Sequence, residues 1–194
     1  MKTLKTTFYM ILGLGLTGCA TTLHMIPTDF TLGDKEESVV IGRVIYDMGV
    51  KPIGFFDRLS KIEVELERVG GPVLKETTGT NYIIVCDKSC RDSSYFVALP
   101  PGNYRITRIV SGQLESRPSG SLEIGKGQVT YVGTLKFVSA GIGQSILGSL
   151  SRGGATTVAG DRQVEDEYES AVKSFLERYP QINQEIVKSL VQLK

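Results

Sequence analysis

The fold is indicated most clearly by one stretch of the sequence, FVALPPGNYRI at residues 96–106. Apolar and β-favouring residues on both sides of a proline–glycine pair are typical of two strands joined by a turn. Pro101 presets the backbone for the turn, and Gly102 can supply a positive φ angle. Beyond the turn, Tyr104 and Ile106 alternate with polar residues, so we expect both side chains to face a core.

Five more stretches have the composition of strands, and they span residues 39–46, 60–69, 82–86, 122–124 and 128–138. In the second of them, apolar residues alternate with Glu63, Glu65 and Glu67. We interpret the three acids as the solvated face of a strand rather than as paired catalytic carboxylates. Short turns separate the strands, so the sequence predicts a mainly β fold, an antiparallel β-sandwich of about seven strands followed by one or two C-terminal α-helices.

The second half of the chain carries three further expectations. One face of the last strand is expected to carry four apolar residues, Val129, Tyr131, Leu135 and Phe137. The Gly/Ser-rich residues 139–154 are predicted to be an excursion from the sandwich, with contact to a partner or a membrane as the alternative. Residues 161–194 are predicted to be helical, with apolar residues at helical spacing from Val164 to Leu176 and an end at Pro180. A second short helix would turn five residues inward, Ile182, Ile186, Val187, Leu190 and Val191.

The first 18 residues have the features of an export signal. Lys2 and Lys5 precede an apolar core at residues 8–16, which is too short to cross a bilayer. Leu16-Thr17-Gly18-Cys19 follows and resembles the lipobox of bacterial lipoproteins, (Leu/Val/Ile)-x-(Gly/Ala)-Cys. The alternative is an ordinary secretory signal with a chance cysteine.

The lipobox resemblance implies a lipid anchor. Lipid would be attached to the Cys19 thiol, a peptidase would remove the signal peptide at residues 1–18, and the new amine would be acylated. Several acyl chains anchor a protein much more firmly than one. The second mature residue is Ala20 rather than aspartate, which by resemblance to enterobacterial sorting favours the outer membrane. Residues 19–38 are expected to be a membrane tether, and residues 39–160 the sandwich domain.

Two motifs inside the domain resemble known families. FVALPPGNYRI at 96–106 resembles the strand–LPPG-x-Y–strand hairpin of carboxypeptidase-regulatory-like and transthyretin-like sandwich domains. GQVTYVGTL at 127–135 is similar to a strand near the end of the domain in many uncharacterised bacterial lipoproteins, which often finish with an acidic helix ending in Tyr-Pro, as at Tyr179-Pro180. The resemblance implies an accessory or binding module without catalytic residues, although a fold does not fix a function.

Two cysteines remain once Cys19 is acylated. Cys86 and Cys90 are an even pair in an oxidising compartment, and a tight turn between them would allow a local disulfide. Zinc is the competing idea, but four ligands are needed and the one histidine, His24, lies in the expected tether. A redox dithiol usually has the spacing C-x-x-C, which is one residue shorter. We therefore predict a disulfide and neither a metal nor a cofactor.

The balance of basic and acidic side chains indicates which class of binding partner to expect. Without Lys2 and Lys5, 20 basic side chains remain against 21 acidic ones, so nucleic acid is not an expected partner. We expect a membrane-anchored module that binds or scaffolds another envelope protein or peptidoglycan, and no catalytic residues. The alternatives are an accessory lipoprotein of a secretion complex and an enzyme that acts on cell-wall or surface glycans through a carboxylate pair.

Overall fold

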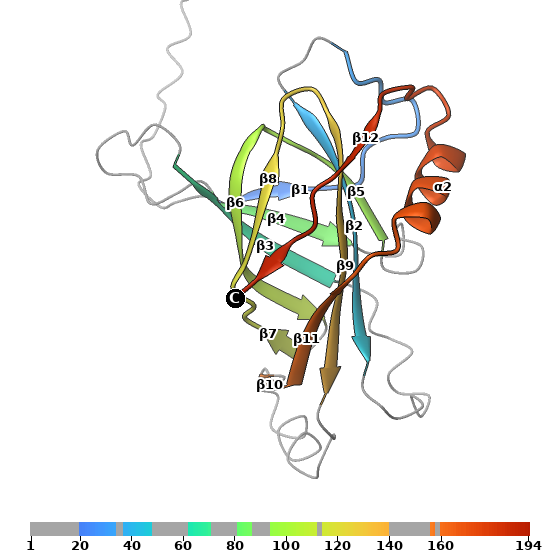
Figure 1. Cartoon of the computed structure of the whole chain (residues 1–194). Helices are drawn as coiled ribbons and strands as arrows, with labels where there is room; N and C mark the ends of the chain where they lie inside the picture. The colour runs from blue at the N-terminus through green and yellow to red at the C-terminus, as the bar shows by residue number, and fades with distance from the viewer. Residues whose placement is uncertain are drawn as a thin grey trace, which may run out of the picture.

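The computed structural model describes residues 20–33, 37–47, 62–70, 81–86, 94–111, 114–139, 156–157 and 160–194. This part of the chain is mainly β, with thirteen strands and the single helix α2 (Tyr168–Arg178) (Figure 1). Every stretch predicted as a strand is one: β2 (Ser38–Asp47), β3 (Ile62–Val69), β4 (Asn81–Cys86), β5 (Ser94–Leu99), β6 (Gly102–Ser111), β8 (Gly120–Ile124) and β9 (Val129–Ser139). Six short strands accompany them: β1 (Thr21–Leu23), β7 (Leu114–Ser116), β10 (Thr156–Thr157), β11 (Gly160–Glu165), β12 (Ile186–Lys188) and β13 (Gln192–Leu193).

The strands form two mixed sheets. The eight-stranded sheet has the order β1-β4-β3-β6-β7-β10, with β8 beside β6 and β13 beside β8. The five-stranded sheet has the order β11-β9-β2-β5, with β12 beside β9. Four pairs are parallel, β1–β4, β2–β9, β7–β10 and β9–β12. The predicted antiparallel arrangement is therefore not confirmed, because an alternating pattern shows which face of a strand is buried but not the direction of its neighbour.

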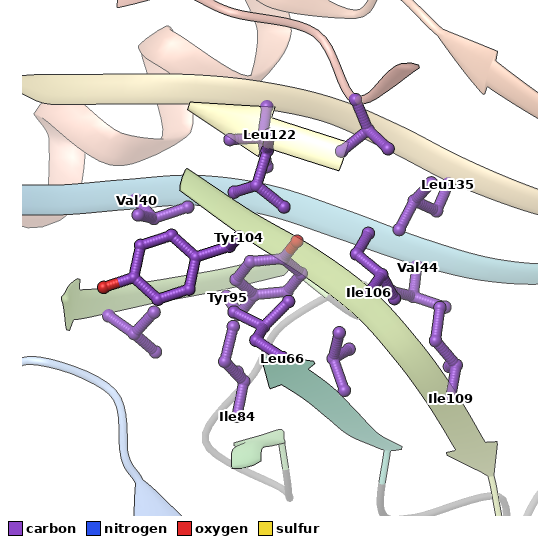
Figure 2. Close-up of a cluster of buried hydrophobic side chains, with 14 of the residues drawn as sticks. Val40, Val44, Leu66, Ile84, Tyr95, Tyr104, Ile106, Ile109, Leu122 and Leu135 are labelled. Carbon is purple, nitrogen blue, oxygen red and sulfur yellow. The ribbon is translucent and has the colours of Figure 1, made fainter. Parts of the chain in front are cut away.

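The two sheets bury a common set of apolar side chains, which we call the inner core. Its members come from four strands of the larger sheet, three of the smaller sheet and the C-terminal region, and each is at most 8% exposed: Val40, Val44, Ile62, Val64, Leu66, Tyr82, Ile84, Cys86, Tyr95, Val97, Leu99, Tyr104, Ile106, Ile109, Leu122, Ile124, Val132, Leu135, Phe137 and Val191. Figure 2 shows side chains from both sheets pointing toward one another. Burying a Leu or Ile side chain completely stabilises the folded state by about 1.5–3 kcal/mol relative to leaving it exposed.

A second apolar cluster covers the opposite face of the five-stranded sheet. We call it the outer cluster, and it consists of Ile26, Val39, Ile41, Phe96, Val129, Tyr131, Phe175, Tyr179 and Ile182. Phe96 of β5 meets the rings of Phe175 and Tyr179 edge-on, with centroids 5.4 and 5.8 Å apart. The sheet is therefore buried on both faces, with α2 against its outer side (Figure 1).

Residues 100–102 join the two sheets, which corrects the predicted hairpin. β5 pairs with β2, whereas β6 pairs with β3, β7 and β8 in the other sheet. Pro100 and Pro101 have no N–H to donate, so no ladder can run through them. Gly102 has the expected positive φ, +150°. The buried Tyr104 donates its hydroxyl to the Pro100 carbonyl at 2.6 Å, the arrangement called a tyrosine corner in Greek-key sandwiches.

A bulge in β9 changes which face its residues occupy. Val129 and Tyr131 pack in the outer cluster, whereas Leu135 and Phe137 pack in the inner core. The expectation that all four share one face is therefore wrong. The pairing with β2 gains one residue on β9 after Tyr131, and Gly133 in this stretch has φ +96°. One inserted residue exchanges the faces of a strand because its side chains alternate with period two.

The C-terminal region is less helical than predicted. α2 ends before Pro180 as expected, but residues 160–165 form β11 and pair with β9 instead of starting the helix. The predicted second helix is absent from the described residues 182–191, because this segment reaches the free edges of both sheets. β12 pairs with β9, and β13 pairs with β8. Open strand edges supply hydrogen bonds that an isolated short helix would have to form alone.

Candidate functional site

The outer face of the eight-stranded sheet carries alternating acids and bases. Glu63, Glu65 and Glu67 of β3 are half-buried on this face, while the apolar residues between them are buried in the inner core. The prediction that these acids occupy the face of β3 opposite the core is therefore confirmed. Glu67 forms an ion pair with Arg105 of β6, so the positive and negative charges neutralise one another across neighbouring strands.

Glu115 of β7 lies between two guanidinium groups on the same face. Its carboxylate accepts hydrogen bonds from Nε of Arg117 at 2.8 Å and from Nη2 of Arg108 at 3.1 Å. These bonds, that of Arg117 first, lower the pKa of Glu115. The group is thus held ionised and serves as a charge partner within the sheet.

A polar hollow of about 430 Å³ opens on this face. β3, β6, β8 and the C-terminal residues form it, and the side chains that carry its chemistry are Asn103, Arg105, Ser121, Glu123, Gln192 and Lys194. Register explains why they meet: Asn103 is opposite Glu123, and Ser121 lies between Arg105 and Gln192. The side chains of alternate residues on adjacent strands therefore share one surface.

The last residues of the chain complete the hollow. β13 pairs with β8, and the Lys194 N–H donates to the Ser119 carbonyl at 2.9 Å. Gly120 permits this approach, because a Cβ there would lie 2.9 Å from Cγ1 of Val191 and 3.2 Å from Cδ2 of Leu193. The hollow thus depends on a residue without a side chain at the centre of the pairing.

The hollow offers both donors and acceptors to a ligand. An amide, a hydroxyl, a guanidinium and an ammonium group stand beside the carboxylate of Glu123, a set suited to hydrogen bonding with a polar ligand that carries both charges. Within the described residues, no group of three or more His, Cys, Asp or Glu could hold a metal ion. No helix among these residues is long and apolar enough to cross a bilayer.

A second polar cluster holds Glu167, which lies between β11 and α2, against residues of β2 and β9. Thr134 Oγ1 donates to Glu167 Oε2 at 2.7 Å, and Arg43 Nη1 donates to the same oxygen at 3.1 Å. The Glu167 N–H donates to the Tyr131 hydroxyl at 2.8 Å. The Thr134 hydroxyl, followed by Arg43, holds the pKa of Glu167 below its usual range. This cluster fixes the start of the helix against the five-stranded sheet.

The predicted modification sites fall largely outside the described residues. Cys19 and Cys90 lie outside them, as do residues 140–154 of the Gly/Ser-rich excursion. Cys86 ends β4 and is buried, with its sulfur 3.5 Å from the Ser94 carbonyl oxygen. The lipidation and the Cys86–Cys90 disulfide therefore stay predictions. His24 is exposed, as expected.

Residues 20–33, expected to be part of a tether, are docked along the domain. The Ile26 N–H donates to the Phe96 carbonyl at 2.9 Å, and the buried Tyr179 hydroxyl donates to the Ile26 carbonyl at 2.8 Å. Gln181 Nε2 reaches the Thr28 and Phe30 carbonyls at 2.7 and 2.8 Å. We call residues 20–33 the docked segment. Its sequence signal is the scatter of apolar residues that a solvated linker does not need, of which Ile26 is 4% exposed.

Comparison with known proteins gives no relative from which a role could be transferred. No family model matches the chain, and neither curated proteins nor solved structures give a significant match.

Proposed function

We propose that this chain is a lipid-anchored lipoprotein on the periplasmic face of the bacterial outer membrane, where it binds or scaffolds another envelope component. The short leader and the lipobox-like Leu16–Cys19 support the anchorage. The hollow carries the proposed binding role, because it gathers six polar side chains, five of them on strands of a packed core. Sites on such rigid elements are better ordered than sites on loops.

The ligand would be an envelope protein or peptidoglycan. Peptidoglycan stem peptides carry carboxylate and ammonium groups next to hydroxyl-rich sugars. Lys194 would face the carboxylates, together with the N–H groups of Arg105 that do not bond to Glu67, and Glu123 would face an ammonium group. An extended protein segment with mixed charges would meet the same groups, so both ligands belong in the test.

We also propose that the two-sheet core is a variant of the transthyretin-like antiparallel sandwich, in which about seven longer strands form the original framework. The tyrosine corner at Tyr104 supports this assignment. The strands β1 and β12, each parallel to its neighbour, lie at strand edges and would be additions to that framework. The parallel β2–β9 pair differs from the antiparallel pairing of the framework. A Cys86–Cys90 disulfide would close the end of β4; non-reducing peptide mapping tests it, and two free thiols would contradict it.

Binding is tested with isolated peptidoglycan sacculi and with cross-linked, detergent-solubilised envelope. Glu123→Gln and Asn103→Ala alter exposed residues that line the hollow, and Glu169→Gln on α2 is a matched exposed control. We expect the two hollow variants, but not the control, to reduce recovery of the partner. Equal recovery with all variants, or repeated recovery of the protein alone, would contradict the binding role.

Anchorage is tested by Cys19→Ser, with membrane fractionation and mass analysis. The unaltered chain should carry acyl chains on Cys19 and float with membranes, whereas the variant should not. A cleaved, unmodified and soluble product in both cases would contradict the lipoprotein assignment.

A further inference from the structure

We propose that the docked segment holds the domain against the bilayer in one orientation, with the end of the eight-stranded sheet around Val69 facing the lipid headgroups. This inference rests on the proposed acylation of Cys19. It adds which surface of the domain meets the membrane, and it places the hollow, which Val69 and Asn103 border, next to the headgroups.

The anchor and the sheet are separated by a short stretch of chain. Cys19 is two residues before Thr21, which is paired with Tyr82 in the β1–β4 ladder. Two peptide units span at most about 7.6 Å. The bilayer headgroup layer is itself about 5–8 Å thick on each side. An acylated Cys19 therefore keeps the β1 edge of the sheet at the membrane surface.

The docked segment cannot lengthen without breaking hydrogen bonds. Ile26 bonds through both its N–H and its carbonyl, to Phe96 and Tyr179. Beyond it, Gln184 Nε2 donates to the Leu32 carbonyl at 3.1 Å. An undocked chain of 14 residues would instead give a mean reach of about 20 Å, so docking decides whether the domain is held close.

The register of the strands determines which end of the sheet faces the lipid. Thr21 is opposite Tyr82, and Tyr82 is opposite Leu66. The chain before Thr21 therefore points the same way as the end of β3, which is Val69. β3 is two strands from β1, a distance of about 10 Å.

The chemistry of this end suits a bilayer surface. Val69 is 50% exposed, more than the other large exposed hydrophobics of the described residues, and its strand neighbour Asn103 is uncharged. Glu67 pairs with Arg105, whereas Arg68 donates to the neutral Pro101 carbonyl and keeps its positive charge. Glu123 and Lys194, one of each sign, line the hollow that Val69 borders. The described residues at this end thus carry charges of both signs beside one exposed apolar side chain. Such a mixed surface does not require anionic lipids, so we expect the orientation to persist in zwitterionic bilayers and at high salt.

The test uses single tryptophans, because the chain has none. The acylated full-length protein would carry Val69→Trp or, as control, Leu176→Trp. Leu176 is also a partly exposed apolar residue, 40% exposed, and α2 lies on the far side of the molecule from the end of β3 (Figure 1). Each variant is reconstituted into phosphatidylcholine vesicles with headgroup nitroxide labels. We expect strong quenching for Val69→Trp and little for Leu176→Trp, at low and at high salt.

A third variant tests the cause. About ten Gly/Ser residues inserted between Ala20 and Thr21 add a mean reach of about 17 Å and should abolish the quenching of Val69→Trp. Equal quenching at both positions, or unchanged quenching with the insertion, overturns the orientation while the protein still floats with vesicles. Protein that carries no acyl chain by mass analysis and does not float overturns the anchorage as well.

Discussion

Tyr179→Phe tests whether the docked segment is held by the C-terminal region of the domain. The substitution removes one hydroxyl and keeps the ring that packs against Phe96 and Phe175. That hydroxyl donates to the Ile26 carbonyl at 2.8 Å in a fully buried position. Since water cannot replace the lost donor, the Ile26 carbonyl is left with one partner fewer inside the protein.

The size of the effect follows from this burial. A neutral hydrogen bond contributes about 0.5–1.5 kcal/mol, and a buried group without its partner costs about 1–3 kcal/mol. We expect Tyr179→Phe to lower the free energy of unfolding by about 1–3 kcal/mol. Tyr168→Phe is the matched control, because its hydroxyl also donates to a backbone carbonyl at 2.8 Å, that of Ile186, but in a partly solvated position. Its loss should cost at most about 1 kcal/mol.

Urea unfolding measures both values, with the denaturant slope checked for constancy. Native-state hydrogen exchange adds a local readout, because the Ile26 N–H donates to Phe96 and should exchange faster in Tyr179→Phe than in Tyr168→Phe. The reasoning is refuted if the two variants lose the same stability, or if exchange at Ile26 is the same in both.

Three further predictions concern other parts of the domain. Gly42→Ala should lose about 1–3 kcal/mol of stability in urea unfolding, since its Cβ would lie 2.2 Å from the Tyr95 hydroxyl oxygen; a neutral effect would contradict this. The Thr134 hydroxyl lowers the pKa of Glu167, so this group contributes stability above its ordinary pKa and loses it as the pH falls through the lowered value. Glu167→Gln should flatten the decline in stability that sets in below the ordinary glutamate pKa of 4.5, and an unchanged acid profile would argue against it. Gly120→Val should displace β13, seen as faster trypsin cleavage of the C-terminal region and weaker partner binding; wild-type resistance would show that the pairing tolerates the side chain.

Local patterns were sufficient to predict seven of the strands, β2 to β6, β8 and β9. The alternation in β3 and the turn before Tyr104 depend on neighbouring residues only, and both are found in the structure. The pairing of the strands depends on distant residues instead. Pro100 and Pro101 interrupt the ladder of β5, but residues 96–106 do not show whether the next strand returns beside β5 or joins another sheet, because Tyr104 is buried in both cases. The bulge at Gly133 likewise requires knowledge of β2.

The candidate site was less accessible to prediction than the fold. Its lining residues, such as Asn103 and Lys194, are far apart in the sequence and are ordinary surface types. They meet because β13 is added to β8, and a two-residue strand such as Gln192–Leu193 has no periodicity to detect. The acidic row on β3 was visible, and the structure places it as part of a charge-paired face.

Both ends of the described chain lie along strand edges, and this determines where the protein can be altered. β1 covers the edge of β4, and β13 covers that of β8. Exposed edges invite pairing with other chains, so these additions protect the larger sheet. They also place Ala20 and Lys194 at the margins of the same sheet.

A C-terminal tag would lie next to the hollow, where the Lys194 N–H donates to the Ser119 carbonyl. We therefore expect a tag after Lys194 to weaken partner binding, whereas the same tag inserted in the exposed turn at Lys126 should leave it unchanged. Equal binding by the two tagged proteins would show that the C-terminal region does not contribute to the ligand contact.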